Sequence, residues 1–291
     1  MGTDLGGRPV AGGAHRQTVI FDLDGVLVDS FGVMRQAFTI AYAEVVGPGE
    51  PPFEEYNRHL GRYFPDIMRI MNLPLAMEEP FVRESYRLAR EVVLFDGVEE
   101  MLRRLRARGH GLAVATGKSG PRARHLLGEL GVLSLFDHVI GSDEIARPKP
   151  APDIVLRALD LLGAAPAEAM MLGDAVADID SARAAGVMAV AALWGETDGV
   201  ELLAARPDAV LHRPAELLAL LGEDGTRATA AVSGCGAADR AAADRAAAGP
   251  AASDALVAGS VDVPTARGDL LAGPPTLATA AHRAGSLLGR D

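Results

Sequence analysis

Short apolar runs alternate with longer amphipathic segments between residues 95 and 221. The apolar runs predict β-strands, and the amphipathic segments, each about a dozen residues long, predict helices. Strands are expected at 19–21, 111–115, 138–140, 170–172, 187–193 and 209–211, and helices at 98–108, 121–130, 150–162 and 179–185. Alternation of this kind produces right-handed β-α-β units. We therefore predict an α/β fold in which a doubly wound parallel sheet is covered by helices on both faces.

A helical block interrupts this pattern directly after the first strand. Apolar residues recur at helical spacing over 31–46, and shorter helices are expected at 53–60, 64–71 and 79–93. No segment between residues 31 and 93 has the pattern of a strand. We therefore predict an α-helical cap at 31–94, inserted into a core formed by 18–30 and 95–221.

The two ends of the chain differ from the rest in composition. Residues 1–17 are polar and rich in glycine, and residues 222–291 consist mainly of Ala, Gly, Arg, Asp and Pro without a sustained period. Such segments bury too little apolar surface to offset the entropy lost on ordering. We expect 1–17 to be flexible and 222–291 to be largely disordered.

The composition of the chain restricts the classes of partner that the protein is expected to bind. The 291 residues carry a formal net charge of −11, which argues against a nucleic acid or a membrane surface as a partner. The single cysteine, Cys235, excludes a disulfide framework, and neither a secretory signal nor a transmembrane run is evident. We expect a cytoplasmic protein whose partner is a small molecule.

Two carboxylates stand at the end of the first predicted strand. Its β-favouring run stops at Asp22, and Asp24 follows two positions later, just before Gly25. Because side chains alternate between the faces of a strand, both acids are expected to point to the same side. Open α/β sheets bind ligands at the carboxyl ends of their strands. Taken alone, however, this short acidic sequence is more typical of a turn.

Four later residues strengthen the prediction of a reaction centre. Thr116 and Asp174 each end a predicted strand, Asp178 follows Asp174, and Lys149 lies in a loop stiffened by two prolines. Because the strands of a parallel sheet end at one edge, these groups are expected to converge. Each has a simpler explanation: Thr116 could cap a helix, Lys149 could be solvated, and the acids could favour a helix start. Together with the first two acids, they predict one site.

The chemistry that this set favours is phosphoryl transfer. Asp22 would attack phosphorus and form an aspartyl-phosphate. Asp24 would protonate the leaving oxygen and then deprotonate the attacking water. Thr116, nearby backbone N–H groups and Lys149 would hold the transferring oxygens.

A magnesium ion is the cofactor that these acids predict. A nucleophilic carboxylate and a phosphate repel each other unless a hard cation holds them together, and a few oxygen ligands suit Mg²⁺. Asp174 would coordinate the ion directly. Asp178 would act through water or orient Lys149.

Four motifs in this order resemble those of the haloacid dehalogenase (HAD) superfamily over about residues 18–221. They are Asp-Leu-Asp-Gly-Val-Leu-Val-Asp-Ser at 22–30, Thr-Gly-Lys at 116–118, Arg-Pro-Lys-Pro-Ala-Pro-Asp at 147–153 and Leu-Gly-Asp-Ala-Val-Ala-Asp at 172–178. The resemblance implies a Rossmann-like core, Asp22 as nucleophile and Asp24 as acid/base. It also implies that the backbone carbonyl of Asp24 binds Mg²⁺, in addition to Asp22, Asp174 and Asp178.

The helical insert resembles the small cap of the phosphoglycolate phosphatase and β-phosphoglucomutase branch. Residues 94–98 and 115–120 resemble phosphatases encoded with 3-amino-5-hydroxybenzoate (AHBA) biosynthesis in ansamycin producers. This implies a Mg²⁺-dependent phosphatase that acts on a small phosphate monoester in that pathway. An aminosugar phosphate or a related intermediate is then the expected substrate.

Other activities within the superfamily agree less well with the residues of this sequence. The dehalogenases do not need an acid at the position of Asp24, and phosphonoacetaldehyde hydrolases need a cap lysine, which residues 31–93 lack. A sugar-phosphate mutase shares every core motif and remains an alternative. A second alternative, from another class, is a non-catalytic partner of a biosynthetic enzyme of the same pathway.

Substrate contacts are expected from two segments. The cap loop around Gly61 can swing, and its neighbours His59 and Arg62 could pair with a substrate, although each is also typical of a structural or surface residue. Gly117 and Lys118 directly follow Thr116 and are expected to contact the phosphate or the substrate.

Overall fold

A six-stranded parallel sheet forms the centre of the computed structural model, which describes residues 17–195 and 197–222. The predictions for residues 1–16 and 223–291 lie outside the described residues. The strand order is β5-β4-β1-β6-β7-β8, and every neighbouring pair is parallel. The strands are β1 (Thr18–Phe21), β4 (Gly111–Thr116), β5 (His138–Gly141), β6 (Ala169–Gly173), β7 (Met188–Ala192) and β8 (Ala209–Leu211).

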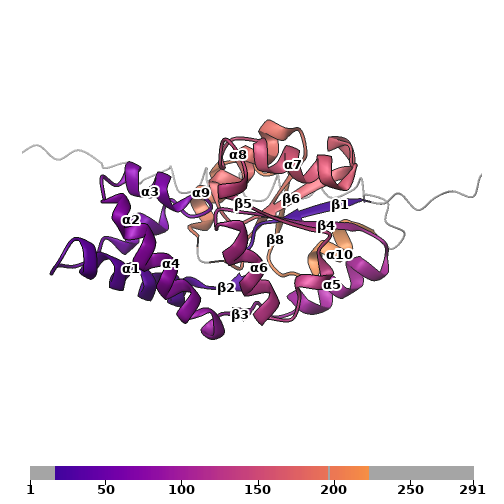
Figure 1. Ribbon diagram of the computed structural model, residues 1–291. Helices are drawn as coiled ribbons and strands as arrows, with labels where there is room; N and C mark the ends of the chain where they lie inside the picture. Colours follow the sequence, from indigo (N-terminus) through magenta and orange to yellow (C-terminus); the bar gives the residue numbers. More distant parts are fainter. Residues whose placement is uncertain (1–16, 196, 223–291) are drawn as a thin grey trace, which may run out of the picture. The chain divides into compact units, whose positions relative to one another are not determined.

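Helices cover both faces of this sheet (Figure 1). The alternation along β1 divides the core, because Val19 and Phe21 belong to one apolar cluster and Ile20 to another. The first cluster includes side chains of α5 (Val98–Ala107), α6 (Gly120–Glu129) and α10 (Glu216–Leu220). The second includes side chains of α7 (Asp153–Leu162), α8 (Val176–Ala185) and α9 (Gly199–Ala204). The predicted doubly wound α/β fold is confirmed.

The segment between β1 and α5 contains a hydrophobic cluster of its own. Its helices are α1 (Phe31–Val45), α2 (Phe53–Asn57), α3 (Phe64–Ile70), η1 (Leu75–Met77), α4 (Glu78–Arg87) and η2 (Ala89–Glu91). Buried aromatic rings dominate this cluster, and the rings of Phe64 and Phe81 stack with centroids 4.1 Å apart. Rings of this size contribute much of the apolar area that a small helical unit can bury.

The helix predicted over 79–93 is wrong at its C-terminal end. Helix α4 ends at Arg87, and β3 (Val93–Leu94) pairs antiparallel with β2 (Val28–Asp29). The adjacent β-branched residues Val92 and Val93 favour an extended backbone, and the pairing partner becomes available only in the folded chain. Strands β2 and β3 thus join the two chain segments that connect the helical insert to the core.

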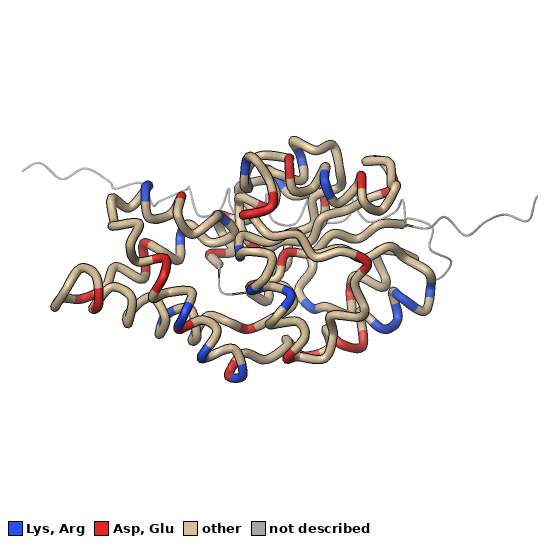
Figure 2. The backbone as a smooth tube through the Cα atoms, viewed as in Figure 1, with Lys and Arg blue, Asp and Glu red and all other residues tan. Residues whose placement is uncertain are grey.

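Acidic and basic residues are interspersed along the described helices (Figure 2). On α5, for example, Glu99 and Arg103 approach to 2.6 Å and Glu100 and Arg104 to 2.7 Å, both at i,i+4 spacing. These pairs are exposed, so each contributes only a few tenths of a kcal/mol, about 0.3–0.5. No described helix combines the length and the apolar composition needed to cross a bilayer.

Candidate active site

The three central strands carry the predicted site residues to one edge of the sheet. β1 lies between β4 and β6. Asp22 follows β1, Thr116 is the last residue of β4, and Asp174 follows β6. The backbone N–H of Asp22 donates to the carbonyl of Leu172 at 2.9 Å, which extends the sheet pairing as far as the acid.

Three buried carboxylates meet at this edge. One oxygen from each of Asp22, Asp174 and Asp178 lies within 4.8 Å of the others, and all three residues are at most 3% exposed. Asp178 reaches the group from the first turn of α8. Thr197 Oγ1 donates to Asp174 Oδ2 at 2.7 Å and so fixes the orientation of that carboxylate.

Lys149 is fully enclosed and touches two of these acids. Its Nζ donates to Asp22 Oδ1 at 2.7 Å, to Asp178 Oδ1 at 2.6 Å and to the carbonyl of Ala115 at 3.1 Å. These three contacts match the three hydrogens of an ammonium group. Burial would lower the pKa of Lys149, but the carboxylates of Asp178 and Asp22 together keep it above its usual value.

The three carboxylates of Asp22, Asp174 and Asp178 together can carry more negative charge than the single ammonium of Lys149 neutralises. Burial raises the pKa of Asp22 to about 7, and although Lys149 opposes this shift, the charges of Asp178 and Asp24 add to it. Burial, together with the charges of Asp178 and Asp22, also raises the pKa of Asp174 well above its ordinary value. Oxygen ligands with uncompensated negative charge are what a divalent cation such as Mg²⁺ requires. The three acids therefore fit a Mg²⁺ ion.

Asp24 belongs to a different local environment. Its Oδ1 accepts hydrogen bonds from Ser30 Oγ and from Lys118 Nζ, and its carboxylate is not part of the three-acid group. Burial raises the pKa of Asp24, but Lys118, Ser30 and the charge of Arg122 together lower it below its usual value. Asp24 is therefore held as an ionised hydrogen-bond acceptor beside the other acids.

Thr116 and Gly117 lie at the end of β4 and in the turn after it. Thr116 is fully buried, and its Oγ1 accepts the backbone N–H of Lys118 at 3.2 Å, which holds the turn after β4. The cap loop approaches Gly117 so closely that a Cβ there would lie 2.5 Å from the carbonyl oxygen of Arg62 and 2.9 Å from that of Gly61. Only glycine permits this approach of two backbones.

A cavity of about 390 Å³ lies between the cap loop and the sheet edge. The predicted residues Asp22, Asp24, Arg62, Gly117 and Lys118 line it. His59 is not among the lining residues. The backbone N–H of Arg62 donates to its carbonyl at 3.3 Å, so His59 contributes to the shape of the cap loop.

Two site residues were not predicted from the sequence. Arg122 lines the cavity from the first turn of α6, and Thr197 holds Asp174 from the loop before α9. Arginine is abundant in this chain and Thr197 belongs to no recognisable motif, so neither position stands out in the sequence.

Replacement of Gly25 by Ala tests how tightly Asp174 is packed. Gly25 has φ +75°, and a Cβ there would lie 1.9 Å from Asp174 Oδ2. We expect Gly25→Ala to lower the free energy of unfolding by at least about 2 kcal/mol, measured by urea denaturation, because strained backbone alone costs about 1–3 kcal/mol. Gly97→Ala is the matched control, since Gly97 has φ +81° and open space at its Cβ. Equal losses in both variants would contradict a clash at Asp174.

The chain matches the family model described as haloacid dehalogenase-like hydrolase over residues 19–192, which is more than half of its length. It is 36% identical to a probable phosphatase, IndB, of Dickeya dadantii over 69% of this chain and 91% of that protein. It is 31% identical to a phosphoglycolate phosphatase of Aquifex aeolicus over 70% of this chain and 96% of that protein. A haloacid dehalogenase-like hydrolase of Streptococcus pneumoniae has a similar structure, with a TM-score of 0.62, 28% identity and coverage of 71% of this chain and 99% of that one. The chain therefore belongs to the haloacid dehalogenase-like hydrolases, as an enzyme of their phosphatase type.

Proposed function

We propose that this enzyme hydrolyses a small-molecule phosphate monoester with Mg²⁺ and an aspartyl-phosphate at Asp22. The observation that carries the proposal is that one oxygen from each of Asp22, Asp174 and Asp178 lies within 4.8 Å of the others, with the buried ammonium of Lys149 bound to Asp22 and Asp178. A binding protein would gain nothing from burying three acids and one lysine together, because such burial is unfavourable. In an enzyme, the same arrangement is preorganised for a charged transition state.

Two displacements at phosphorus make up the proposed reaction. In the first, a carboxylate oxygen of Asp22 bonds to phosphorus, the bond to the leaving oxygen breaks, and protonated Asp24 gives that oxygen its proton. In the second, water attacks the phosphorus of the aspartyl-phosphate, ionised Asp24 takes the proton, and inorganic phosphate is released. The contacts that favour ionised Asp24 in this structure support its role as the base in the second displacement.

Asp22, Asp174 and Asp178 are the side chains that would hold Mg²⁺, with the backbone carbonyl of Asp24 as a further ligand. The ion would neutralise the repulsion between the phosphate and the acids. Lys149 would keep Asp22 oriented for attack through their 2.7 Å contact. Thr116 and the backbone after it would hold the phosphate oxygens.

The covered cavity supports a small substrate. The backbone of Gly61 and Arg62 lies against Gly117, so the site lies beneath the cap loop and a protein substrate would not enter it. The resemblance of 94–98 and 115–120 to AHBA-associated phosphatases supports a place in that pathway. A panel of sugar phosphates and hydroxy-acid phosphates, assayed for released phosphate, tests this assignment. A strong preference for phosphoglycolate over every pathway-like substrate would contradict it.

Metal dependence can be tested through Thr197. We expect p-nitrophenyl phosphate hydrolysis to disappear in EDTA and to return with Mg²⁺. Thr197→Val removes the hydrogen bond to Asp174 but keeps the side-chain shape, and the half-saturating Mg²⁺ concentration should rise about 10-fold or more. Ser142→Ala is a control, because Ser142 Oγ donates to the carbonyl of Thr116 and contacts no predicted metal ligand. Turnover that is unaffected by EDTA would contradict the metal assignment.

A further inference from the structure

A buried guanidinium borders the active-site cavity without a carboxylate partner. Arg122 is 6% exposed and lies in the first turn of α6. Its Nη2 donates to Ser85 Oγ at 2.9 Å, and its Cζ lies 5.1 Å from the centroid of the Phe81 ring. Its Nε has no hydrogen-bond partner. Within the described part of the chain, Arg122 forms no ion pair.

The charge of Arg122 is poorly compensated by its surroundings. A buried cation is strongly unfavourable unless an anion accompanies it. The hydroxyl of Ser85 and the ring of Phe81 are neutral partners. The negative charge of Asp24 acts on Arg122 through space, but Asp24 Oδ1 already accepts hydrogen bonds from Lys118 and Ser30. Arg122 therefore places a buried charge without a carboxylate hydrogen-bonded to it at the wall of a cavity that a ligand can enter.

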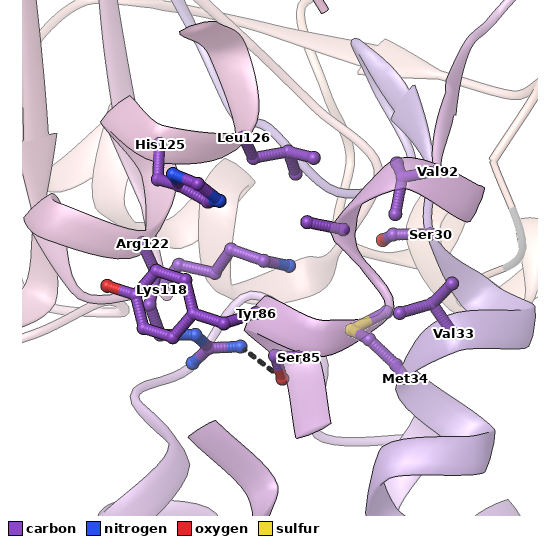
Figure 3. Close-up of a pocket in the computed structure, with 11 residues that line it drawn as sticks. Ser30, Val33, Met34, Ser85, Tyr86, Val92, Lys118, Arg122, His125 and Leu126 are labelled. Carbon is purple, nitrogen blue, oxygen red and sulfur yellow. Dashed lines mark hydrogen bonds between the residues drawn. The ribbon is translucent and has the colours of Figure 1, made fainter. Parts of the chain in front are cut away.

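The position of Arg122 corresponds to the leaving-group side of the reaction. Arg122 and Lys118 line the cavity that holds Asp22 and Asp24, and both also line a second cavity of about 360 Å³. Figure 3 shows this second cavity, with Lys118 and Arg122 opposite Ser30. Because Asp24 would protonate the leaving oxygen, the rest of the leaving group must extend from Asp24 toward these residues.

We propose that Arg122 binds a second anionic group of the substrate, a carboxylate or a second phosphate carried by the leaving group. This inference rests on the proposed function, since it uses Asp22 as the point of attack and Asp24 as the acid. The planar guanidinium offers a fork of donors that matches an oxyanion. The enzyme then prefers an ester whose leaving group carries an anion to a matched ester whose leaving group is neutral.

Two matched pairs of substrates test this preference. Phosphoglycolate is compared with its neutral amide, and ethylene glycol bisphosphate with ethylene glycol monophosphate, by kcat/KM with Mg²⁺ present. We expect the wild-type enzyme to prefer the acidic member of at least one pair by about 30-fold or more. The pair that shows the preference identifies the anion as a carboxylate or a phosphate.

Variants of Arg122 separate binding from a structural role. In Arg122→Met, the ratio of acidic to neutral kcat/KM should fall close to one, and Arg122→Lys should retain part of it. The control Ser85→Ala removes a neighbour of the guanidinium but not its charge, so the ratio should persist. This ratio is independent of the fraction of folded enzyme, because both substrates are measured in one preparation.

Three results would overturn the inference. The first is a wild-type ratio near one for both pairs while p-nitrophenyl phosphate is still hydrolysed, which would leave the proposed function intact. The second is an Arg122→Met variant that loses activity equally on all four substrates. The third is no hydrolysis of any ester with Mg²⁺, which would remove the proposed function as well.

Discussion

Asp22→Asn is expected to lower kcat for p-nitrophenyl phosphate by about 10⁴–10⁶-fold, the scale of losing a catalytic nucleophile. An amide oxygen does not attack phosphorus, whereas the shape of the side chain is nearly unchanged. Asn can still accept the hydrogen bond that Asp22 Oδ1 receives from Lys149 at 2.7 Å. The variant should therefore remain folded, which near-ultraviolet circular dichroism and thermal unfolding would check.

The residue that carries the covalent phosphate can be identified by a measurement that does not depend on kcat. Acid quenching during turnover should trap labelled phosphate on the peptide that contains Asp22, and Asp22→Asn should give none. Label on that peptide from the Asn variant, or equal turnover by the two proteins, would contradict Asp22 as nucleophile. Asp24→Asn is an informative comparison, because the role of Asp24 as acid and base is expected to contribute about 10²–10⁴-fold.

The arrangement at the sheet edge could be predicted because it depends on rules of topology. Asp22 and Asp174 each follow an apolar strand, Thr116 is the last residue of another, and parallel strands end together. Their convergence therefore required only the strand assignments. In the same way, the alternation of strands with helices along the chain was enough to predict a sheet covered on both faces.

The contacts around the edge could not be predicted, because they depend on how distant loops pack. Arg122 and Thr197 acquire their roles from neighbours that the sequence does not indicate, Ser85 for the first and Asp174 for the second. The pairing of β2 with β3 involves two residues from each strand, too few to produce a period. The short helix α9 was not among the predicted helices; its N-cap is Asp198, whose side chain accepts the N–H of Val200 at 2.8 Å.

Lys149→Met is the second variant with a large expected effect, because it changes both activity and stability. Lys149 is fully buried and neutralises part of the charge on Asp22 and Asp178. Removing it should lower kcat by about 10³-fold, the upper range for losing one donor that stabilises a phosphoryl transition state. The two acids would also lose a buried partner, so the free energy of unfolding should fall by about 3–5 kcal/mol in urea without Mg²⁺.

Lys118→Met is the matched control, since Lys118 and Lys149 are the only lysines in the chain. Lys118 pairs with Asp24, and the side chains are 11% and 15% exposed, so water can partly replace the lost contact. The loss of stability should therefore be smaller in Lys118→Met than in Lys149→Met. Equal losses would show that the pairing of Lys149 with Asp22 and Asp178 is not what balances the buried charge. Added Mg²⁺ should stabilise Lys149→Met more than wild type, because Asp22 and Asp178, which lose the ammonium, are also predicted ligands of the ion.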